Sequence, residues 1–135
     1  MSPPGIQEDA ALRNRIESMT QAIRAKDVDA LMTHYAPDVV VNDVTSPLDA
    51  QGADAYRRKF ERWFDSISGE LDYEMHDLHV FVGEKAGHSY CTSHIRGTRK
   101  NGTKADYWVR VTTEFQKVNG EWLVDHEHIS MPAEQ

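Results

Sequence analysis

Asp43 is the residue of this sequence best placed for acid–base chemistry. It follows the β-branched run Val39–Val41, and Val41 and Val44 flank it. Apolar neighbours partly desolvate a carboxylate and make it a better proton acceptor, as a general base requires. An aspartate in this position can instead cap the turn before Pro47 through an Asx-type hydrogen bond. The residues alone leave both interpretations open.

His94 and Arg96 lie two residues apart in another segment that resembles a strand. They share one face of that strand, because side chains alternate along an extended chain. A guanidinium group on an inward face would suit a carboxylate ligand. The alternative is that this face points to solvent while Cys91, Ser93 and Ile95 pack inward. The period of two separates the faces without deciding which one is buried.

Four polar residues follow one another near the end of the chain. His126 and His128 share one face, and Asp125 and Glu127 share the other. The His-Glu-x-x-His pattern of helical zinc sites is absent, so we expect no metal. The imidazoles more simply hydrogen-bond across the sheet or at a subunit contact. If the other face turns inward, Asp125 and Glu127 would enter the interior as rival bases.

The elements that position these residues follow from hydrophobic periodicity and turn chemistry. Apolar residues at spacings of three and four predict an amphipathic helix over 6–26. Asp27 is expected to cap a short second helix, which continues through Tyr35 and ends at Pro37. A strand over 39–44, a loop around Pro47 and a third helix over 53–67 follow. Four strands are then expected over 71–82, 88–98, 107–118 and 122–130. The order predicts an α+β fold in which one curved sheet wraps over the helices.

The third helix and the strand over 107–118 supply further candidates. Tyr56 can place its ring in the core and its hydroxyl at a cavity mouth, while Trp63 lies on the same apolar stripe and fits a core position. Basic residues on the helix are expected to form a solvated face, namely Arg57, Arg58, Lys59 and Arg62. The odd positions of the strand, which include Thr113, should face the core. The even positions, with Trp108 beside Arg110, suit either a dimer interface or a solvated face.

Length and charge exclude several classes of protein. The 135 residues make one domain, expected over 1–135 with residues 1–8 as a flexible tail. With 22 acidic and 15 basic residues the net charge is −7, which argues against a nucleic-acid partner. The sequence shows no apolar run long enough to span a bilayer and no signal-peptide pattern, so we expect no membrane partner and a cytoplasmic location.

Two segments carry a family resemblance. The run Tyr35-Ala36-Pro37-Asp38-Val39-Val40-Val41-Asn42-Asp43, followed by a Pro-containing loop and Gly52, resembles the first strand of ketosteroid isomerases and SnoaL-like polyketide cyclases. These families belong to the nuclear-transport-factor-2-like superfamily. The ending, from Asn119-Gly120-Glu121-Trp122 to His126-Glu127-His128-Ile129-Ser130-Met131-Pro132, is similar to the association domain of calcium/calmodulin-dependent protein kinase II. The resemblance covers nearly the whole chain after Asp9.

The resemblance implies a cone-shaped fold, in which a curved antiparallel or mixed sheet and three N-terminal helices enclose a pocket. It places Asp43 at the position of the isomerase base, which removes a proton next to a carbonyl. The isomerases stabilise the enolate with a Tyr and a neutral Asp; here Met19 stands at the first position and Thr113 at or next to the second. Arg96 matches an arginine that lines the pocket of the association domain.

We therefore expect a cofactor-independent isomerase, lyase or cyclase. Asp43 and His94 are the expected catalytic residues, and the expected substrate contacts are Tyr56, Arg96, Thr113, Trp63 and His128. The expected partners are an anionic or carbonyl-containing small molecule and a second copy of the chain. The alternative is a non-catalytic ligand-binding or oligomerisation module that resembles the kinase association domain.

Overall fold

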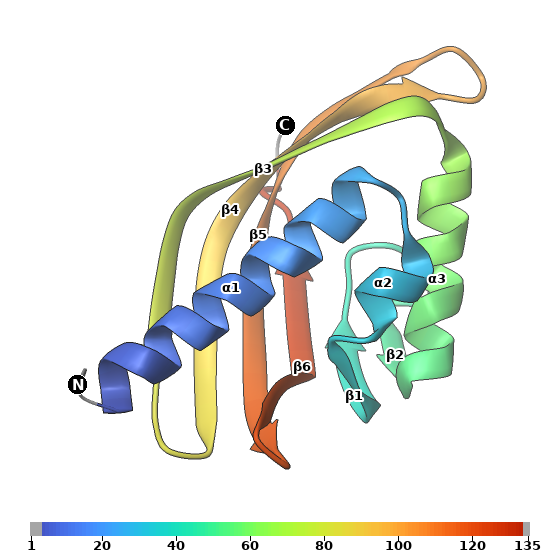
Figure 1. The fold of residues 1–135 in the computed structure, drawn as a ribbon. Helices are drawn as coiled ribbons and strands as arrows, with labels where there is room; N and C mark the ends of the chain where they lie inside the picture. The colour runs from blue at the N-terminus through green and yellow to red at the C-terminus, as the bar shows by residue number, and fades with distance from the viewer. Residues whose placement is uncertain (1–3, 134–135) are drawn as a thin grey trace.

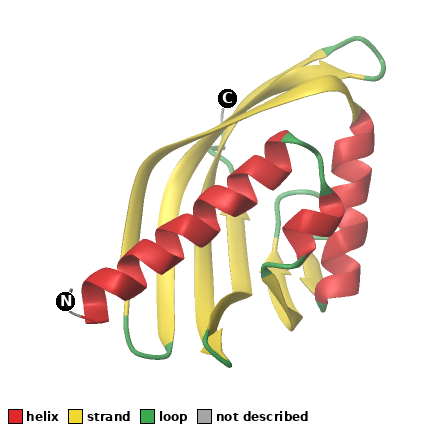
Figure 2. Ribbon diagram, viewed as in Figure 1, coloured by secondary structure: helices red, strands yellow, loops and turns green. Residues whose placement is uncertain are grey.

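Helices come first along the chain and a long sheet follows. The computed structural model describes residues 4–133 (Figures 1 and 2). The helices are α1 (Pro4–Arg24), α2 (Val28–Met32) and α3 (Ala53–Ser66), and the strands are β1 (Tyr35–Asn42), β2 (Asp49–Gln51), β3 (Ile67–Val82), β4 (Ala86–Arg99), β5 (Lys104–Val118) and β6 (Glu121–Ser130).

The strands form one six-stranded mixed sheet in the order β2-β1-β6-β5-β4-β3. All neighbouring strands are antiparallel except β1 and β6, which are parallel and place Val41 opposite Glu127. The sheet curves, α1 crosses its concave side, and α2 and α3 lie beyond β1 (Figure 1). This arrangement confirms the expected α+β cone.

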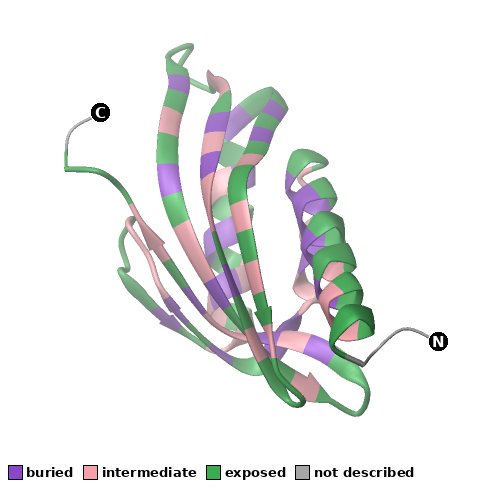
Figure 3. Cartoon of the chain, turned by 90° about the vertical axis from the view of Figure 1, so that its left-hand side faces the viewer, coloured by how far each residue is buried: buried purple, intermediate pink, exposed green. Residues whose placement is uncertain are grey.

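The apolar stripe of α1 faces the sheet as its spacing predicts. Leu12, Ile16, Met19 and Ile23 are all buried, and the strands opposite them alternate buried and exposed residues (Figure 3). The helix begins at Pro4 and so includes most of the segment expected to be a tail. Glu8 fixes this first part, since its carboxylate accepts hydrogen bonds from Trp122 Nε1 and Lys117 Nζ, each at 2.9 Å.

The region between α1 and β1 departs in one respect from the sequence-based expectation. Asp27 caps α2 as expected by accepting a hydrogen bond from the Ala30 amide at 3.0 Å. The helix ends at Met32, however, and Tyr35 and Pro37 belong to β1. Proline favours extended backbone in the residue before it, which is compatible with a strand and disrupts a helix.

Two bulges shape β3, one of the two edge strands, which begins directly after α3. Its register with β4 shifts between Ser68 and Leu71 and again between His76 and His79. Bulges bend a strand and increase its twist, which suits the curvature of this sheet. At the turn between β5 and β6, Asn119 and Gly120 both take positive φ, as the Asn-Gly pair predicts.

None of the helices within residues 4–133 combines the length and apolar character needed to cross a membrane.

Adjacent residues of β1 provide a test of this packing. Val41 has no exposed surface, whereas Val40 is 38% exposed. We expect Val41→Ala to lower the free energy of unfolding by about 2 kcal/mol, because it removes two buried methyl groups and leaves a cavity. Val40→Ala should change it by less than about 0.5 kcal/mol. Urea denaturation measures both, and equal losses would contradict the assigned faces of β1.

Candidate active site

A cavity of about 410 Å³ lies between the concave face of the sheet, α1 and α3. Most of its wall is apolar and comes from core side chains, among them Ile16, Met19, Phe60 and Val109. Pockets of this size and character hold small organic molecules. The polar groups in the wall are few, so each of them restricts what a ligand can be.

Glu127 is the most buried carboxyl group in this wall, with 5% of its surface exposed. Its Oε1 accepts hydrogen bonds from the Tyr56 and Tyr35 hydroxyls, the latter at 3.2 Å, and its Oε2 accepts one from Thr113 Oγ1 at 2.7 Å. Thr113 is its cross-strand partner on β5. Four elements, β1, α3, β5 and β6, thus meet at one carboxyl group.

The tyrosines that contact Glu127 belong to an aromatic cluster. The rings of Tyr35 and Tyr56 meet edge to face with centroids 5.0 Å apart, and Tyr56 stacks on Phe60 at 4.3 Å. Such contacts fix ring orientation as well as burying area. The cluster therefore holds both hydroxyls on Glu127.

Burial dominates the electrostatics of this group. Loss of hydration raises the pKa of Glu127 above its ordinary value, although the three hydroxyl donors oppose the shift, and the nearby Asp43 charge adds to it. Burial and the Glu127 charge also raise the pKa values of Tyr35 and Tyr56 well above normal. Glu127 accordingly takes up a proton more readily than an exposed glutamate.

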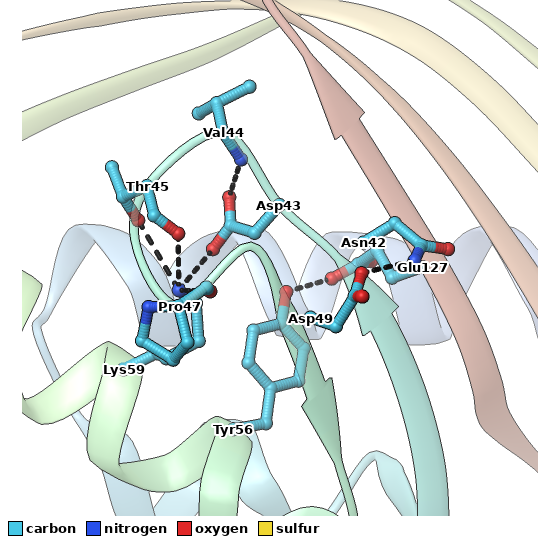
Figure 4. A network of polar contacts seen from close by, with 9 residues as sticks. All are labelled: Asn42, Asp43, Val44, Thr45, Pro47, Asp49, Tyr56, Lys59 and Glu127. Carbon is cyan, nitrogen blue, oxygen red and sulfur yellow. Dashed lines mark hydrogen bonds and ion pairs between the residues drawn. The ribbon is translucent and has the colours of Figure 1, made fainter.

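Asp43 lies in the cavity wall just after β1 and pairs with a buried lysine (Figure 4). Its Oδ2 is 3.2 Å from Lys59 Nζ, and only 13% and 5% of the two side chains are exposed. Lys59 also donates to the carbonyl oxygens of Thr45 at 2.9 Å and Pro47 at 2.7 Å, and Asp43 Oδ1 accepts from the Val44 amide at 2.7 Å. The lysine therefore orients the carboxylate and holds the loop that borders the cavity.

Two other expected substrate contacts, Trp63 and Thr113, line the cavity together with Tyr56 and Asp43. Tyr107 of β5 lies in the same cavity wall as Trp63. The structure thus brings four of the seven predicted site residues to one cavity.

His94 and Arg96 lie on the outer face of the sheet, which corrects the expectation that they line the pocket. Arg96 is exposed and pairs with Glu74 at 3.3 Å, and His94 contacts Asp106 at 2.6 Å. The opposite face of β4 is inward, since Ser93 and Ile95 are buried. The alternative left open by the sequence, in which this arginine is solvated, is the one observed.

His128 is also outside the cavity, because its neighbour Glu127 takes the inward position on β6. His126 hydrogen-bonds across the sheet to Asn42 at 2.8 Å, as the simpler interpretation of the histidines predicts. Asp125 does not join Glu127 in the cavity wall. The register between β5 and β6 shifts at this point, which interrupts strict alternation.

Three residues that the structure places at the site were not singled out from the sequence. Lys59 was assigned to a solvated basic face, Tyr35 to a short helix, and Glu127 entered only as an alternative to the histidines. A usable signal existed for Lys59, which lies three residues after Tyr56 and adjoins Phe60 on the buried stripe of α3. Within residues 4–133 no three metal-ligating side chains are grouped to hold an ion.

Comparison with known proteins supports the fold. A model of the SnoaL-like domain matches residues 12–134. A search of curated protein sequences gave no match. Among solved structures, a nuclear transport factor 2-like protein of unknown function from Pseudomonas putida KT2440 aligns with a TM-score of 0.85 at 24% identity, covering 94% of this chain and 88% of that one.

Two further structures connect to the expected functions. A proposed dehydratase of the nuclear transport factor 2-like family from Streptomyces avermitilis has a TM-score of 0.83 at 15% identity, covering 96% of this chain and 99% of that one. A proposed calcium/calmodulin-dependent protein kinase II association domain from Xanthomonas campestris has a TM-score of 0.79 at 22% identity, covering 100% and 95%. At these identities the likeness shows the fold alone.

The buried Lys59–Asp43 pair can be tested by removing its cation. We expect Lys59→Met to lower the free energy of unfolding by about 3 kcal/mol, because it leaves a poorly solvated carboxylate unpaired and two loop carbonyls without a donor. Adding Asp43→Asn should recover part of this loss.

An exposed pair supplies the control for that experiment. Lys100 Nζ is 2.8 Å from Asp65, but 61% and 78% of the two side chains are exposed. Lys100→Met should therefore cost less than about 1 kcal/mol in urea denaturation. If the two lysine variants lose the same stability, Lys59 does not act as a buried tether.

Proposed function

Because the chain belongs to the SnoaL-like domain family, we propose that it is an enzyme that removes a proton next to the carbonyl group of a small molecule without a cofactor. The observation that carries the proposal is a carboxylate in the wall of a mostly apolar cavity, with a hydroxyl donor in the same cavity. An apolar, partly enclosed site strengthens each polar interaction made inside it. The similar structure from Streptomyces avermitilis, which is named as a proposed dehydratase, supports lyase chemistry within this class.

Asp43 is the proposed base. The Val44 amide and Lys59 each occupy one carboxylate oxygen, and each oxygen has a second lone-pair site that can accept a proton. Holding the carboxylate from two sides reduces the reorganisation needed before proton transfer. Lys59 acts through Asp43 and is a positioning residue.

Tyr56 is the proposed donor to an oxygen atom of the substrate. Of the three groups expected from the sequence to polarise a carbonyl, Arg96 and His94 are on the outer face, and Tyr56 lies in the cavity. A phenolic hydroxyl in a dry site binds a carbonyl oxygen and strengthens its hold as negative charge develops. The substrate class that fits is therefore a largely apolar ketone or related carbonyl compound.

Proton abstraction can be measured directly with a simple ketone. Wild-type protein in D2O should exchange the α-protons of 4-phenylbutan-2-one faster than buffer, as followed by NMR. Asp43→Asn should lower the protein-dependent rate by a factor of about 100 to 10,000, the range typical of a lost general base.

Asp38→Asn is the matched control for this measurement. Asp38 lies on β1, the strand that leads to Asp43, but is exposed, so its loss should leave the exchange rate unchanged. Wild-type protein that is stabilised by the ketone yet exchanges none of its protons would favour the binding-module alternative.

We also propose a homodimer formed through the outer face of β3, β4 and β5. Phe81, Tyr90 and Trp108 are 48%, 43% and 40% exposed there. Phe81 and Tyr90 stack on each other, and Trp108 stacks on His94. The same face has charges of both signs, so it can be complementary to its own copy across a twofold axis.

Sedimentation velocity tests the dimer. Trp108→Glu should shift the protein from dimer to monomer, because it places a carboxylate in a desolvated contact. Ile6→Glu on α1, which changes an even more exposed apolar residue to the same charge, should remain dimeric. A wild-type protein that sediments as a monomer would exclude the proposed interface.

A further inference from the structure

Each hydroxyl group around Glu127 has a single proton, so it can donate either to Glu127 or to a ligand. Tyr35, Tyr56 and Thr113 each have one hydroxyl proton, and all three are within hydrogen-bond reach of Glu127. When Glu127 is ionised it is only an acceptor, so all three protons point toward it. In this state Tyr56 has no proton directed at a ligand.

Protonation of Glu127 changes this count. A neutral carboxyl group has a proton of its own and donates it to one of its neighbours. The Tyr56 oxygen is within hydrogen-bond reach of Glu127 and lines the cavity, so it can accept this proton. The Tyr56 proton is then released and can point into the cavity.

Protonated Glu127 and Tyr56 together can do more than polarise a carbonyl group. An enolate oxygen needs only a hydrogen bond, whereas a departing hydroxide needs a complete proton. A tyrosine alone is a weak acid and becomes an unfavourable anion in a buried site after giving up its proton. A protonated carboxyl group behind it can replace that proton as it leaves.

Asp43 is placed to act on the adjacent carbon atom. Val41 of β1 is the parallel register partner of Glu127, and Asp43 follows Val41 by two residues. Asp43 comes directly after the end of β1, and its side chain lines the same cavity as Tyr56 and Glu127. A β-hydroxy carbonyl compound held in this cavity would present its α-hydrogen to Asp43 and its β-oxygen to the Tyr56 hydroxyl.

We propose that Glu127, acting through Tyr56, supplies the proton for an oxygen leaving group, so that the cavity eliminates water from a β-hydroxy carbonyl compound. This inference rests on the proposed function, because it requires Asp43 as the base. Asp43 takes the α-proton, and the electrons of that C–H bond form the new C=C bond. The C–O bond breaks toward oxygen, which receives the Tyr56 proton, and Glu127 returns a proton to Tyr56. The products are an α,β-unsaturated carbonyl compound and water, and solvent restores both carboxyl groups.

The pH dependence follows from the groups around Glu127. The titratable groups that face it are Tyr35 and Asp43 from β1 and its following loop, Tyr56 from α3, Tyr73 from β3 and Cys91 from β4. Elimination needs Glu127 protonated, so its rate falls as pH rises through the raised pKa of this group. Proton exchange at an unsubstituted ketone transfers no proton from Tyr56 to a leaving group, so its alkaline limb should be much weaker than that of elimination.

Two matched probes separate the steps. In 4-hydroxy-4-phenylbutan-2-one the β-hydroxyl can leave, and the product absorbs in the near ultraviolet; 4-phenylbutan-2-one lacks that hydroxyl and reports proton abstraction alone. We expect Glu127→Gln to lower kcat for elimination by about 100-fold while α-proton exchange changes less than about threefold. Tyr56→Phe also removes the proposed carbonyl donor, so it should lower both rates. Glutamine keeps the size of the side chain and an oxygen acceptor for the tyrosines.

Thr113→Val tests the role of Glu127 independently of its removal. The Thr113 hydrogen bond favours the ionised carboxylate and so lowers the pKa of Glu127. Its loss should move the alkaline limb of elimination to higher pH and leave the exchange profile in place. A purely structural role of Glu127 would not move this limb, and the measurement stands even if Glu127→Gln fails to fold.

The outcomes distinguish the two proposals. If wild type exchanges the ketone protons but eliminates no water, or if Glu127→Gln eliminates at the wild-type rate, the inference is wrong and the proposed function stands. A fixed alkaline limb in Thr113→Val also overturns the inference. If wild type shows no Asp43-dependent exchange, the proposed function fails and the inference fails with it.

Discussion

The burial of one carboxyl group constrains the rest of the site. Glu127 is 5% exposed and has no cation among its hydrogen-bond partners. A buried polar group without partners is costly, so the fold must bring donors to it. Those donors come from β1, α3 and β5, which therefore have to converge on β6. The aromatic cluster around Tyr56 and Phe60 packs at this meeting point and gives the cavity its inner wall.

The cavity contains two carboxyl groups in different surroundings. Asp43 has an ammonium group and a backbone amide beside it, and the two hold its carboxylate oxygens in place. Glu127 has only neutral hydroxyls, which satisfy its oxygen atoms without compensating its charge fully. Two acids in one site with opposed environments are the usual arrangement for a base and an acid that act on one substrate.

Periodicity in the sequence predicts the parts of the fold that depend on one element at a time. The stripe of α1, the buried positions of α3 and the inward odd face of β5 all follow from spacing, and the structure confirms them. The resemblance also predicts the cone fold correctly. Spacing cannot decide which face of β4 or β6 is inward, because that depends on what packs against the strand. Arg96 and His128 were accordingly placed in the pocket and lie outside it.

Lys59 shows a different limit of sequence interpretation. Its charge and its basic neighbours favour a solvated face, and only Asp43 and the carbonyl groups of a loop 12 to 14 residues earlier make its burial acceptable. Such a contact depends on how the loop returns to the helix. Tyr35 is similar, since its role depends on a residue 92 positions later in the chain.

The position of β6 has a consequence for how the protein is made. This strand lies between β1 and β5 in the sheet, although every other strand precedes it in the chain. During synthesis β1 and β2 therefore leave the ribosome with one edge unpaired, and they cannot join the β3–β5 hairpins until β6 has emerged. Until β6 is in place, the facing edges of β1 and β5 lack a partner, and unpaired strand edges attract other chains. The same strand closes the sheet and delivers Glu127, so completion of the fold and completion of the cavity are one event.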